Sequence, residues 1–129
     1  MFMIKPYLFV QPAGDMGLGV FTSETIGANI IIEVSPVLIM SGEERKLLDQ
    51  TALHDYIFEW GDGSAQCIVA WGYASLYNHA YESNCEYEMD YKAGLISIKT
   101  IRPIGSGEQL FVNYNGTYNN TASLWFDAK

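Results

Sequence analysis

Three short clusters in this sequence combine residue types that can bind or react. The first places three glycines in six positions, over Gly14–Gly19, and leads into an apolar stretch. The second is the polar pair Asn78-His79, and the third is a turn, an acid and an apolar run that ends at Tyr114. A glycine-rich turn lets a ligand approach the backbone, amide and imidazole groups form hydrogen bonds, and tyrosine carries a hydroxyl on an apolar ring.

Each cluster taken alone also has a purely structural explanation. The glycines suit a plain hairpin bend, Asn78-His79 suits a capped loop with a satisfied histidine, and Tyr114 suits a core position with a polar tip. The glycine spacing is not G-x-G-x-x-G followed by a helix, so neither a dinucleotide site nor a phosphate-binding loop is indicated. The surrounding elements must therefore decide between structure and chemistry.

Length and composition predict one compact domain. The chain has 129 residues, of which 49% are hydrophobic and 14% aromatic, which is enough to bury a core. Seven Lys plus Arg stand against fifteen Asp plus Glu, giving a net charge of −8. Because phosphate contacts need clustered cations, we expect no direct nucleic-acid binding, and an acidic chain favours basic partners.

The sequence shows no segment that suits export or a membrane. Lys5-Pro6 interrupts the apolar N-terminal run, and the apolar stretch over 30–40 contains Glu33 and Pro36. Cys67 and Cys85 form no C-x-x-C unit and predict free thiols in a reduced compartment. We therefore expect a cytoplasmic protein that does not bind membranes.

A metal site is a further hypothesis with little support. Its ligands would have to come from the two histidines and two cysteines, namely His54, His79, Cys67 and Cys85. Their separations match no pattern of metal ligands, so the sequence predicts no metal.

Residue patterns predict a mostly β chain. Stretches rich in β-branched and aromatic residues indicate strands over 7–11, 19–22 and 29–40. Residues 56–60 and 65–70 flank Gly61-Asp62-Gly63-Ser64, which is the chemistry of a hairpin turn. Ser41 and Glu44 have the spacing of a capping box and predict a helix of two to three turns over 45–50.

The stretch over 85–102 predicts a second hairpin. Apolar and acidic residues alternate strictly from Cys85 to Tyr91, which gives one apolar and one acidic face. A two-residue turn at Ala93-Gly94 would pair Met89 with Ile98 and set Glu88 opposite Lys99. The acidic face suits either plain solvation or attraction of a basic substrate.

Taken together and in this order, the three clusters resemble the motifs of the SET-domain protein-lysine methyltransferases. Residues 17–21 (GLGVF) resemble the family's first G-x-G motif, and residues 77–79 (YNH) stand at its F-x-N-H-S motif. Residues 107–110 (GEQL) with Asn113-Tyr114 resemble G-E-E-L-T-x-x-Y. The resemblance spans nearly the whole chain, without zinc clusters before or after it, and is greatest to minimal stand-alone SET proteins of bacterial or viral type.

This resemblance implies a fold that periodicity does not reveal. We expect one SET domain over 1–129, with the β-clip type of β-fold, small curved sheets, one short helix and a knot-like crossing of the C-terminal segment. It also implies S-adenosylmethionine as cofactor and lysine in a protein or peptide as substrate. A homodimer is compatible with the resemblance, since viral minimal SET proteins are dimeric.

The family's site residues carry over by motif. Tyr114 stands at the catalytic tyrosine, while Tyr56 and Tyr118 would wall the lysine channel. The remaining matches would bind the cofactor, through backbone amides of the glycine turn, the Asn78 side chain and the His79 backbone; these residues are Met16, Gly17, Leu18, Gly19, Asn78 and His79. Ala80 replaces the family's serine, so a catalytically inactive SET module that binds cofactor or a basic peptide is the alternative.

Overall fold

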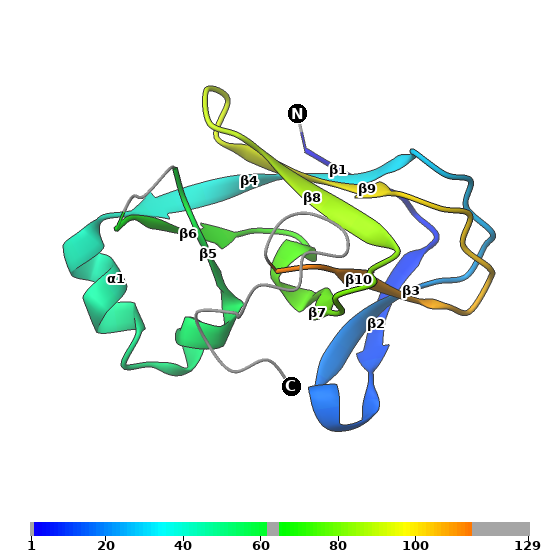
Figure 1. Ribbon diagram of the computed structural model, residues 1–129, viewed down its shortest axis with the longest axis horizontal. Coiled ribbons are helices and arrows are strands. Elements are labelled where there is room, and N and C mark those ends of the chain that lie inside the picture. The colour runs from blue at the N-terminus through cyan, green and yellow to red at the C-terminus, as the bar shows by residue number, and fades with distance from the viewer. Residues whose placement is uncertain (1, 62–64, 115–129) are drawn as a thin grey trace.

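The computed structural model describes residues 2–61 and 65–114. Over these residues ten short strands join into one strongly curled sheet, and Figure 1 shows the sheet wrapping around the centre of the molecule. The strands are β1 (Met3–Ile4), β2 (Leu8–Pro12), β3 (Leu18–Thr22), β4 (Ile31–Met40), β5 (Ile57–Glu59), β6 (Cys67–Ala70), β7 (Asn78–His79), β8 (Cys85–Asp90), β9 (Leu95–Thr100) and β10 (Gln109–Val112). The mostly β prediction is therefore confirmed.

The order of strands along the sheet is β2-β3-β10-β8-β9-β4-β6-β5, with β1 beside β4 and β7 beside β10. Strand β10 pairs antiparallel with β3 and parallel with both β7 and β8. It thus joins segments that are far apart in the sequence. Three 3₁₀ turns, η1 (Gly14–Met16), η2 (Ala52–Tyr56) and η3 (Ala74–Leu76), and one α-helix, α1 (Gly42–Leu48), complete the described chain.

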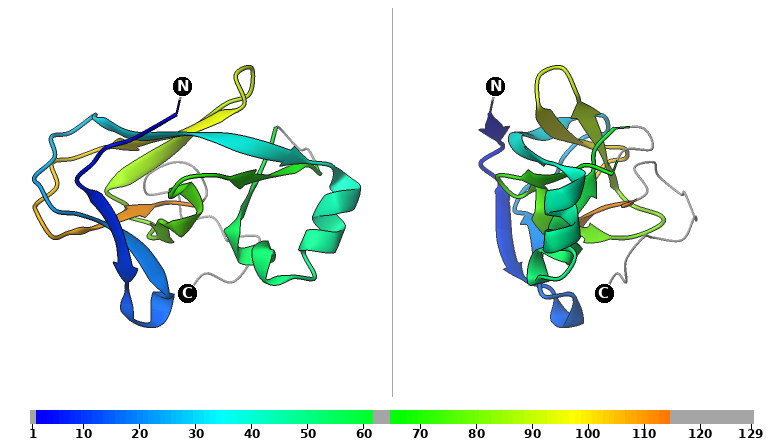
Figure 2. Two further views of the ribbon diagram at one scale, coloured as in Figure 1. Left: turned by 180° about the vertical axis from the view of Figure 1, so that it is seen from behind. Right: turned by 90° about the vertical axis from the view of Figure 1, so that its left-hand side faces the viewer.

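Helix α1 begins at the predicted capping box. The Ser41 hydroxyl accepts a hydrogen bond from the Glu44 N–H at 3.2 Å, and the Glu44 carboxylate accepts one from the Ser41 N–H at 2.9 Å. The helix spans 42–48 rather than 45–50, because the cap sets its first turn directly after Ser41. None of its residues is buried, and Figure 2 shows α1 and the β2–β3 hairpin on opposite sides of the molecule.

The two predicted hairpins both form, but one register was predicted wrongly. Strands β5 and β6 pair as expected. In the β8–β9 hairpin, Met89 pairs with Ile96 and Glu86 with Lys99, which is two residues away from the predicted pairing. The loop has four residues because the Asp90 carboxylate accepts the Ala93 N–H at 2.9 Å, which stabilises the longer turn. Both registers keep the same faces apolar, so alternation alone did not distinguish them.

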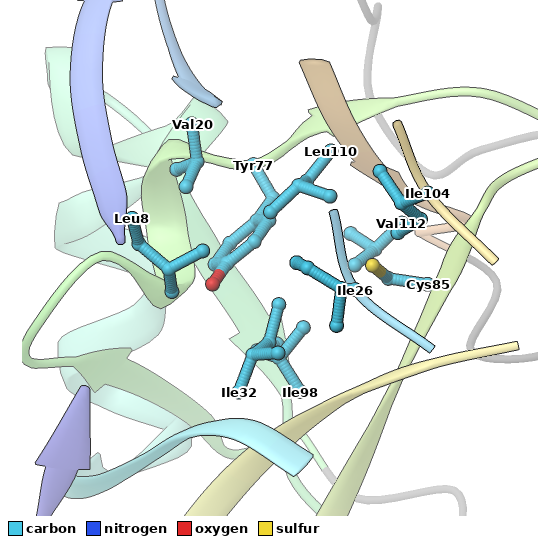
Figure 3. Packing of buried hydrophobic residues seen from close by; sticks show 10 residues of the cluster. All are labelled: Leu8, Val20, Ile26, Ile32, Tyr77, Cys85, Ile98, Ile104, Leu110 and Val112. Carbon is cyan, nitrogen blue, oxygen red and sulfur yellow. The ribbon is translucent and has the colours of Figure 1, made fainter. Parts of the chain in front are cut away.

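Two clusters of buried side chains fill the inside of the sheet. The larger cluster, drawn in Figure 3, contains ten residues from many of the strands and loops between positions 8 and 112: Leu8, Val20, Ile26, Ile32, Tyr77, Cys85, Ile98, Ile104, Leu110 and Val112. The smaller cluster lies under β5 and β6 and contains Phe58, Trp60, Ile68, Ala70, Ala74 and Ile96. Both cysteines are free and buried. No helix within the described ranges is long and apolar enough to cross a membrane.

The knot-like crossing predicted for the C-terminal segment would involve residues after Tyr114, which lie outside the described residues.

Candidate active site

Strand β10 brings the three sequence clusters to one place. On one side Gln109 and Leu110 pair with Phe21 and Val20 of β3, the strand that follows the glycine turn. On the other side Phe111 and Val112 pair with Asn78 and His79. Tyr114 follows two residues after β10. The glycine turn, the Asn78-His79 pair and Tyr114 are therefore assembled by a single four-residue strand.

Hydrogen bonds to residues of the described chain hold both the backbone and the side chain of Tyr114. Its hydroxyl donates to the Tyr77 carbonyl at 2.7 Å, its N–H donates to Nδ1 of His79 at 3.0 Å, and its carbonyl accepts from the Tyr87 hydroxyl at 3.1 Å. The Phe58 ring meets its ring edge-on at 6.4 Å between centroids. Backbone and side chain of Tyr114 are thus fixed separately, which preorganises the hydroxyl.

Burial sets the protonation states around Tyr114. It raises the pKa of the Tyr114 hydroxyl above its usual range, and Tyr56 and Asp55 add to this rise. Burial also raises the pKa of Tyr87 to about 12 and lowers the pKa of His79. Since Nδ1 of the neutral imidazole accepts the Tyr114 N–H, the ring proton of His79 sits on Nε2. At neutral pH the site therefore contains protonated phenols and a neutral imidazole.

The glycine turn approaches the Asn78 side chain closely. The chain turns through η1 and through Gly17, whose φ of +80° favours glycine. A Cβ added at Gly19 would lie 2.5 Å from Oε1 of Gln109 and 3.0 Å from Nδ2 of Asn78. The missing side chain at Gly19 is thus what lets the two amides lie against β3.

Asn78 keeps one polar atom available for a ligand. Its amino group donates to the Leu18 carbonyl at 3.0 Å and to Oε1 of Gln109 at 2.8 Å. Both N–H bonds are thereby used, and Oδ1 has no hydrogen-bond partner among the described residues. Leu18 is half exposed beside it. This oxygen can accept a hydrogen bond from a cationic group.

The loop between β7 and β8 is tied to β10 although Ala80 lacks a hydroxyl. Asn84 donates from Nδ2 to the Gln109 carbonyl at 2.9 Å and accepts the Phe111 N–H at 2.7 Å. The Ala80 N–H also donates to the Val112 carbonyl. Asn84 therefore holds the loop against β10 in the absence of the serine.

The structure locates the predicted site residues as follows. The turn beside Asn78 is formed by Met16, Gly17, Leu18 and Gly19. His79 contacts Tyr114 through its Nδ1, which accepts the Tyr114 N–H. Tyr56 is half exposed at the end of η2, close enough to Tyr114 to raise its pKa. Tyr118 lies outside the described residues. Within the described chain, no three His, Cys, Asp or Glu side chains could jointly hold a metal ion.

Three neighbours of these residues were not predicted from the sequence: the Tyr77 carbonyl, the Gln109 side chain and the buried Glu33. Every residue has a backbone carbonyl, so the residue types could not single out the carbonyl of Tyr77. For Glu33 a signal existed, since it is the one acid in the apolar stretch over 30–40. A charged residue inside a run that reads as a buried strand indicates a satisfied polar group.

Comparison with known proteins agrees with this geometry. The family model of the SET domain matches residues 17–115, which include Gly17–Gly19, Asn78-His79 and Tyr114. The chain belongs to the SET-domain family. The expected fold is shown as well, since this SET domain superposes on a crystal structure from Plasmodium falciparum with a TM-score of 0.66.

Two relatives indicate the kind of activity found among similar SET domains. A Schizosaccharomyces pombe protein named histone-lysine N-methyltransferase, H3 lysine-37 specific, is 33% identical over 126 residues, covering 97% of this chain and 80% of its own. The Plasmodium falciparum protein carries a provisional histone methyltransferase name; it is 26% identical, and the match covers 89% of this chain and 98% of that one. Together these matches support a lysine methyltransferase.

Proposed function

We propose that this SET domain transfers a methyl group from S-adenosylmethionine to the ε-amine of a lysine in a protein substrate. The observation that carries the proposal is the fixed position of the Tyr114 hydroxyl. This hydroxyl donates a hydrogen bond to the Tyr77 carbonyl, next to the Asn78-His79 pair. A hydroxyl and a carbonyl held in place form a polar centre that can position a reacting methyl group and amine. The fold and the relatives support the same reaction.

The residues beside Asn78 fit the charged end of the cofactor. Oδ1 of Asn78 can accept a hydrogen bond from the cofactor's ammonium group, and the turn over 16–19 offers backbone N–H groups. The glycine at position 19 keeps this surface free of a Cβ. When bound, the cofactor supplies the methyl group. Asn78 would orient it, while the His79 backbone would border the adenine.

The site must also supply a neutral amine. Free lysine has a pKa of about 10.4, so at neutral pH roughly one side chain in two thousand is deprotonated, a deficit of about 4–5 kcal/mol. The half-exposed Tyr56 lies near Tyr114, and the buried Phe58 ring packs edge-on against the Tyr114 ring, so the surroundings of Tyr114 are aromatic. Burial against such surface disfavours the ammonium form and lowers the lysine pKa. We assign Tyr118 to the same channel as part of the proposal.

The substrate proposed is a lysine within a basic segment. A net charge of −8 attracts cationic partners. Asp55, next to Tyr56, is close enough to Tyr114 to raise the pKa of its hydroxyl, so one carboxylate lies near the proposed channel. Histone H3, the substrate named for the fission yeast relative, is one basic candidate.

Radiolabelled methyl transfer tests this function directly. The protein is incubated with methyl-labelled S-adenosylmethionine and either cell lysate or purified histones, and labelled lysines are located by mass spectrometry. Tyr114→Phe protein is the matched control. Methyl-lysine formed by the wild type and not by Tyr114→Phe would support the enzyme. Cofactor binding measured by calorimetry without transfer to any substrate would instead favour an inactive binding module.

A further inference from the structure

Glu33 is a fully buried carboxylate on the core face of β4. Its pairing partner in β9 is Ile98, and two residues on Ser35 pairs with Ile96, both isoleucines being completely buried. The register of β4 shifts between Ile31 and Glu33, so one extra residue is inserted before the acid. Such a bulge redirects the side chains that follow it. An acid has therefore been placed where a strand normally carries an apolar residue.

The carboxylate is satisfied by hydrogen bonds rather than by an ion pair. Oε2 accepts from the Ser35 hydroxyl at 2.7 Å and from the Tyr73 N–H at 2.8 Å, and Oε1 accepts from the Tyr77 hydroxyl at 2.9 Å. Residues 2–61 and 65–114 provide no salt bridge to it. Burial raises the pKa of Glu33, and these hydrogen bonds oppose the rise. Replacing buried charged groups by well-packed apolar residues is often neutral or stabilising, so stability alone does not account for an acid at this position.

The turn before Asn78 is built around this carboxylate. Gly72 has a φ of +69°, and a Cβ there would lie 2.5 Å from Oε2 of Glu33 and 2.4 Å from the Ser35 hydroxyl. Only glycine lets the backbone come this close. The Tyr73 N–H then reaches the carboxylate and fixes the start of η3. Glu33 thus sets the path of the chain from Gly72 toward Tyr77.

Tyr77 connects Glu33 to the proposed catalytic hydroxyl. Its side chain is completely buried, and Figure 3 shows the ring within the larger core cluster, with the hydroxyl directed away from Leu110. That hydroxyl donates to Glu33, while the carbonyl of the same residue accepts from the Tyr114 hydroxyl at 2.7 Å. Fixing the ring of Tyr77 therefore also fixes the direction of its carbonyl, which accepts the hydrogen bond from the Tyr114 hydroxyl.

We propose that Glu33 is a positioning residue for methyl transfer, which acts through Tyr77 to hold the hydroxyl of Tyr114 in place. This inference rests on the proposed function, since it assigns Tyr114 the role in the reaction. The shape of the carboxyl group is what positions the segment, because one oxygen accepts the Tyr73 N–H and the other accepts the Tyr77 hydroxyl. The negative charge itself is not required.

Tyr77→Phe is the sharpest test, because it removes one hydroxyl and keeps the ring. We expect kcat for methyl transfer to fall about tenfold, as for a small displacement of a reacting group, with a much smaller change in cofactor affinity. The second readout is the ¹³C resonance of the Tyr114 hydroxyl-bearing carbon in protein with labelled tyrosine, assigned by its loss in Tyr114→Phe. This resonance should move in Tyr77→Phe, since its hydrogen bond changes.

Substitutions of Glu33 separate geometry from charge. Glu33→Gln can keep its oxygen toward Ser35 and Tyr73 and turn its amino group toward the Tyr77 hydroxyl, so it should retain kcat within about threefold. Glu33→Leu should lose kcat and shift the Tyr114 resonance as Tyr77→Phe does. Thr100→Val is the matched control, because it removes a buried hydroxyl bonded to the Gly27 carbonyl and the Ile30 N–H.

The outcomes are distinguishable. A folded Tyr77→Phe protein with wild-type kcat and an unmoved Tyr114 resonance would overturn the positioning role, whether or not Glu33→Leu folds. Equal loss of kcat in Glu33→Gln and Glu33→Leu would show that charge is needed and would also overturn it, as would a similar change in Thr100→Val. Absence of transfer by the wild type would instead reject the proposed function, while the resonance would still report on positioning.

Discussion

Two regions of this SET domain use polar residues in opposite ways. In the tyrosine network, which comprises Glu33, Tyr77, His79, Tyr87 and Tyr114, hydrogen bonds between 2.7 and 3.1 Å join largely buried groups. In the helical lobe, which comprises α1, η2, β5 and β6, the ion pair of Arg45 with Glu59 measures 3.4 Å and the Glu59 side chain is half exposed. Exposed pairs contribute little, whereas breaking a buried network is costly.

The contrast indicates where the sequence is constrained by chemistry. The network fixes Tyr114 from three directions, so its geometry is set before any substrate arrives. The lobe brings Tyr56 near Tyr114 and packs Phe58 against the Tyr114 ring, but buries none of its helix. We therefore expect substitutions in the network to change the reaction and substitutions in the lobe to change stability or substrate preference.

The largest effect is expected from deleting the hydroxyl of Tyr114. Tyr114→Phe keeps the ring and its packing against Phe58, so fold and cofactor affinity should survive, while transfer should fall by roughly two orders of magnitude or more. Tyr91→Phe makes the same chemical change in the exposed β8–β9 turn, where the ring contacts Trp60. Single-turnover rates of the two variants would test the contrast, and equal rates would place Tyr114 among ordinary core residues.

The transfer rate should rise with pH, by up to about tenfold per unit, until the bound lysine is neutral. Only the unprotonated amine attacks, so raising the pH increases the reactive fraction. Burial raises the pKa of Tyr114 and lowers that of His79, so neither group changes charge between about pH 7 and pH 9. A pH profile of kcat with a falling limb in this range would show that a network residue titrates instead.

Asn78→Ala should weaken S-adenosylmethionine binding by about 1–3 kcal/mol, because a hydrogen bond to the charged end of the cofactor is lost. Calorimetry measures the affinity directly. Gln50→Ala is the control beside α1, since it removes an exposed amide whose hydrogen bond to the Lys46 carbonyl measures 3.5 Å. Unchanged affinity in folded Asn78→Ala protein would rule out this role for Asn78.

Gly19→Ala should cost about 1–3 kcal/mol of cofactor affinity, because its Cβ would displace the side-chain amides of Gln109 and Asn78. The far ends of these side chains can shift, so the fold should tolerate the change. Gly27→Ala is the matched control, with its nearest neighbour at 3.8 Å. Equal cofactor affinity in the two variants would contradict the interpretation of Gly19 as part of the binding surface.

The smallest effect is expected at the cap of α1. Ser41→Ala removes a hydroxyl that accepts the Glu44 N–H and should lower the free energy of unfolding by about 1 kcal/mol. Transfer should remain at the wild-type rate, because α1 buries no residue. Thermal unfolding and the transfer assay together check this, and a large loss of transfer would show that the lobe is coupled to the reaction.

Local structure was predictable because it depends on neighbours in the sequence. The capping box at Ser41, the β5–β6 hairpin and the glycine turn follow from groups a few residues apart. The exception is the β8–β9 register, where the Asp90 side chain stabilises a four-residue turn that leaves the same faces buried. Each of the three motifs that resemble the family is also only a few residues long, which is why they could be recognised from the sequence.

By itself, the sequence determined the mostly β composition, the turns and caps, and the residue types at the candidate site. Only the tertiary structure decided that β10 sets Asn78 beside the glycine turn, that the Tyr114 hydroxyl rests on the Tyr77 carbonyl, and that Glu33 lies inside the core. The hydrogen bonds in these contacts join residues 31 to 60 positions apart in the chain. Contacts between residues so far apart depend on how the sheet curls, because neither residue affects the local secondary structure around the other.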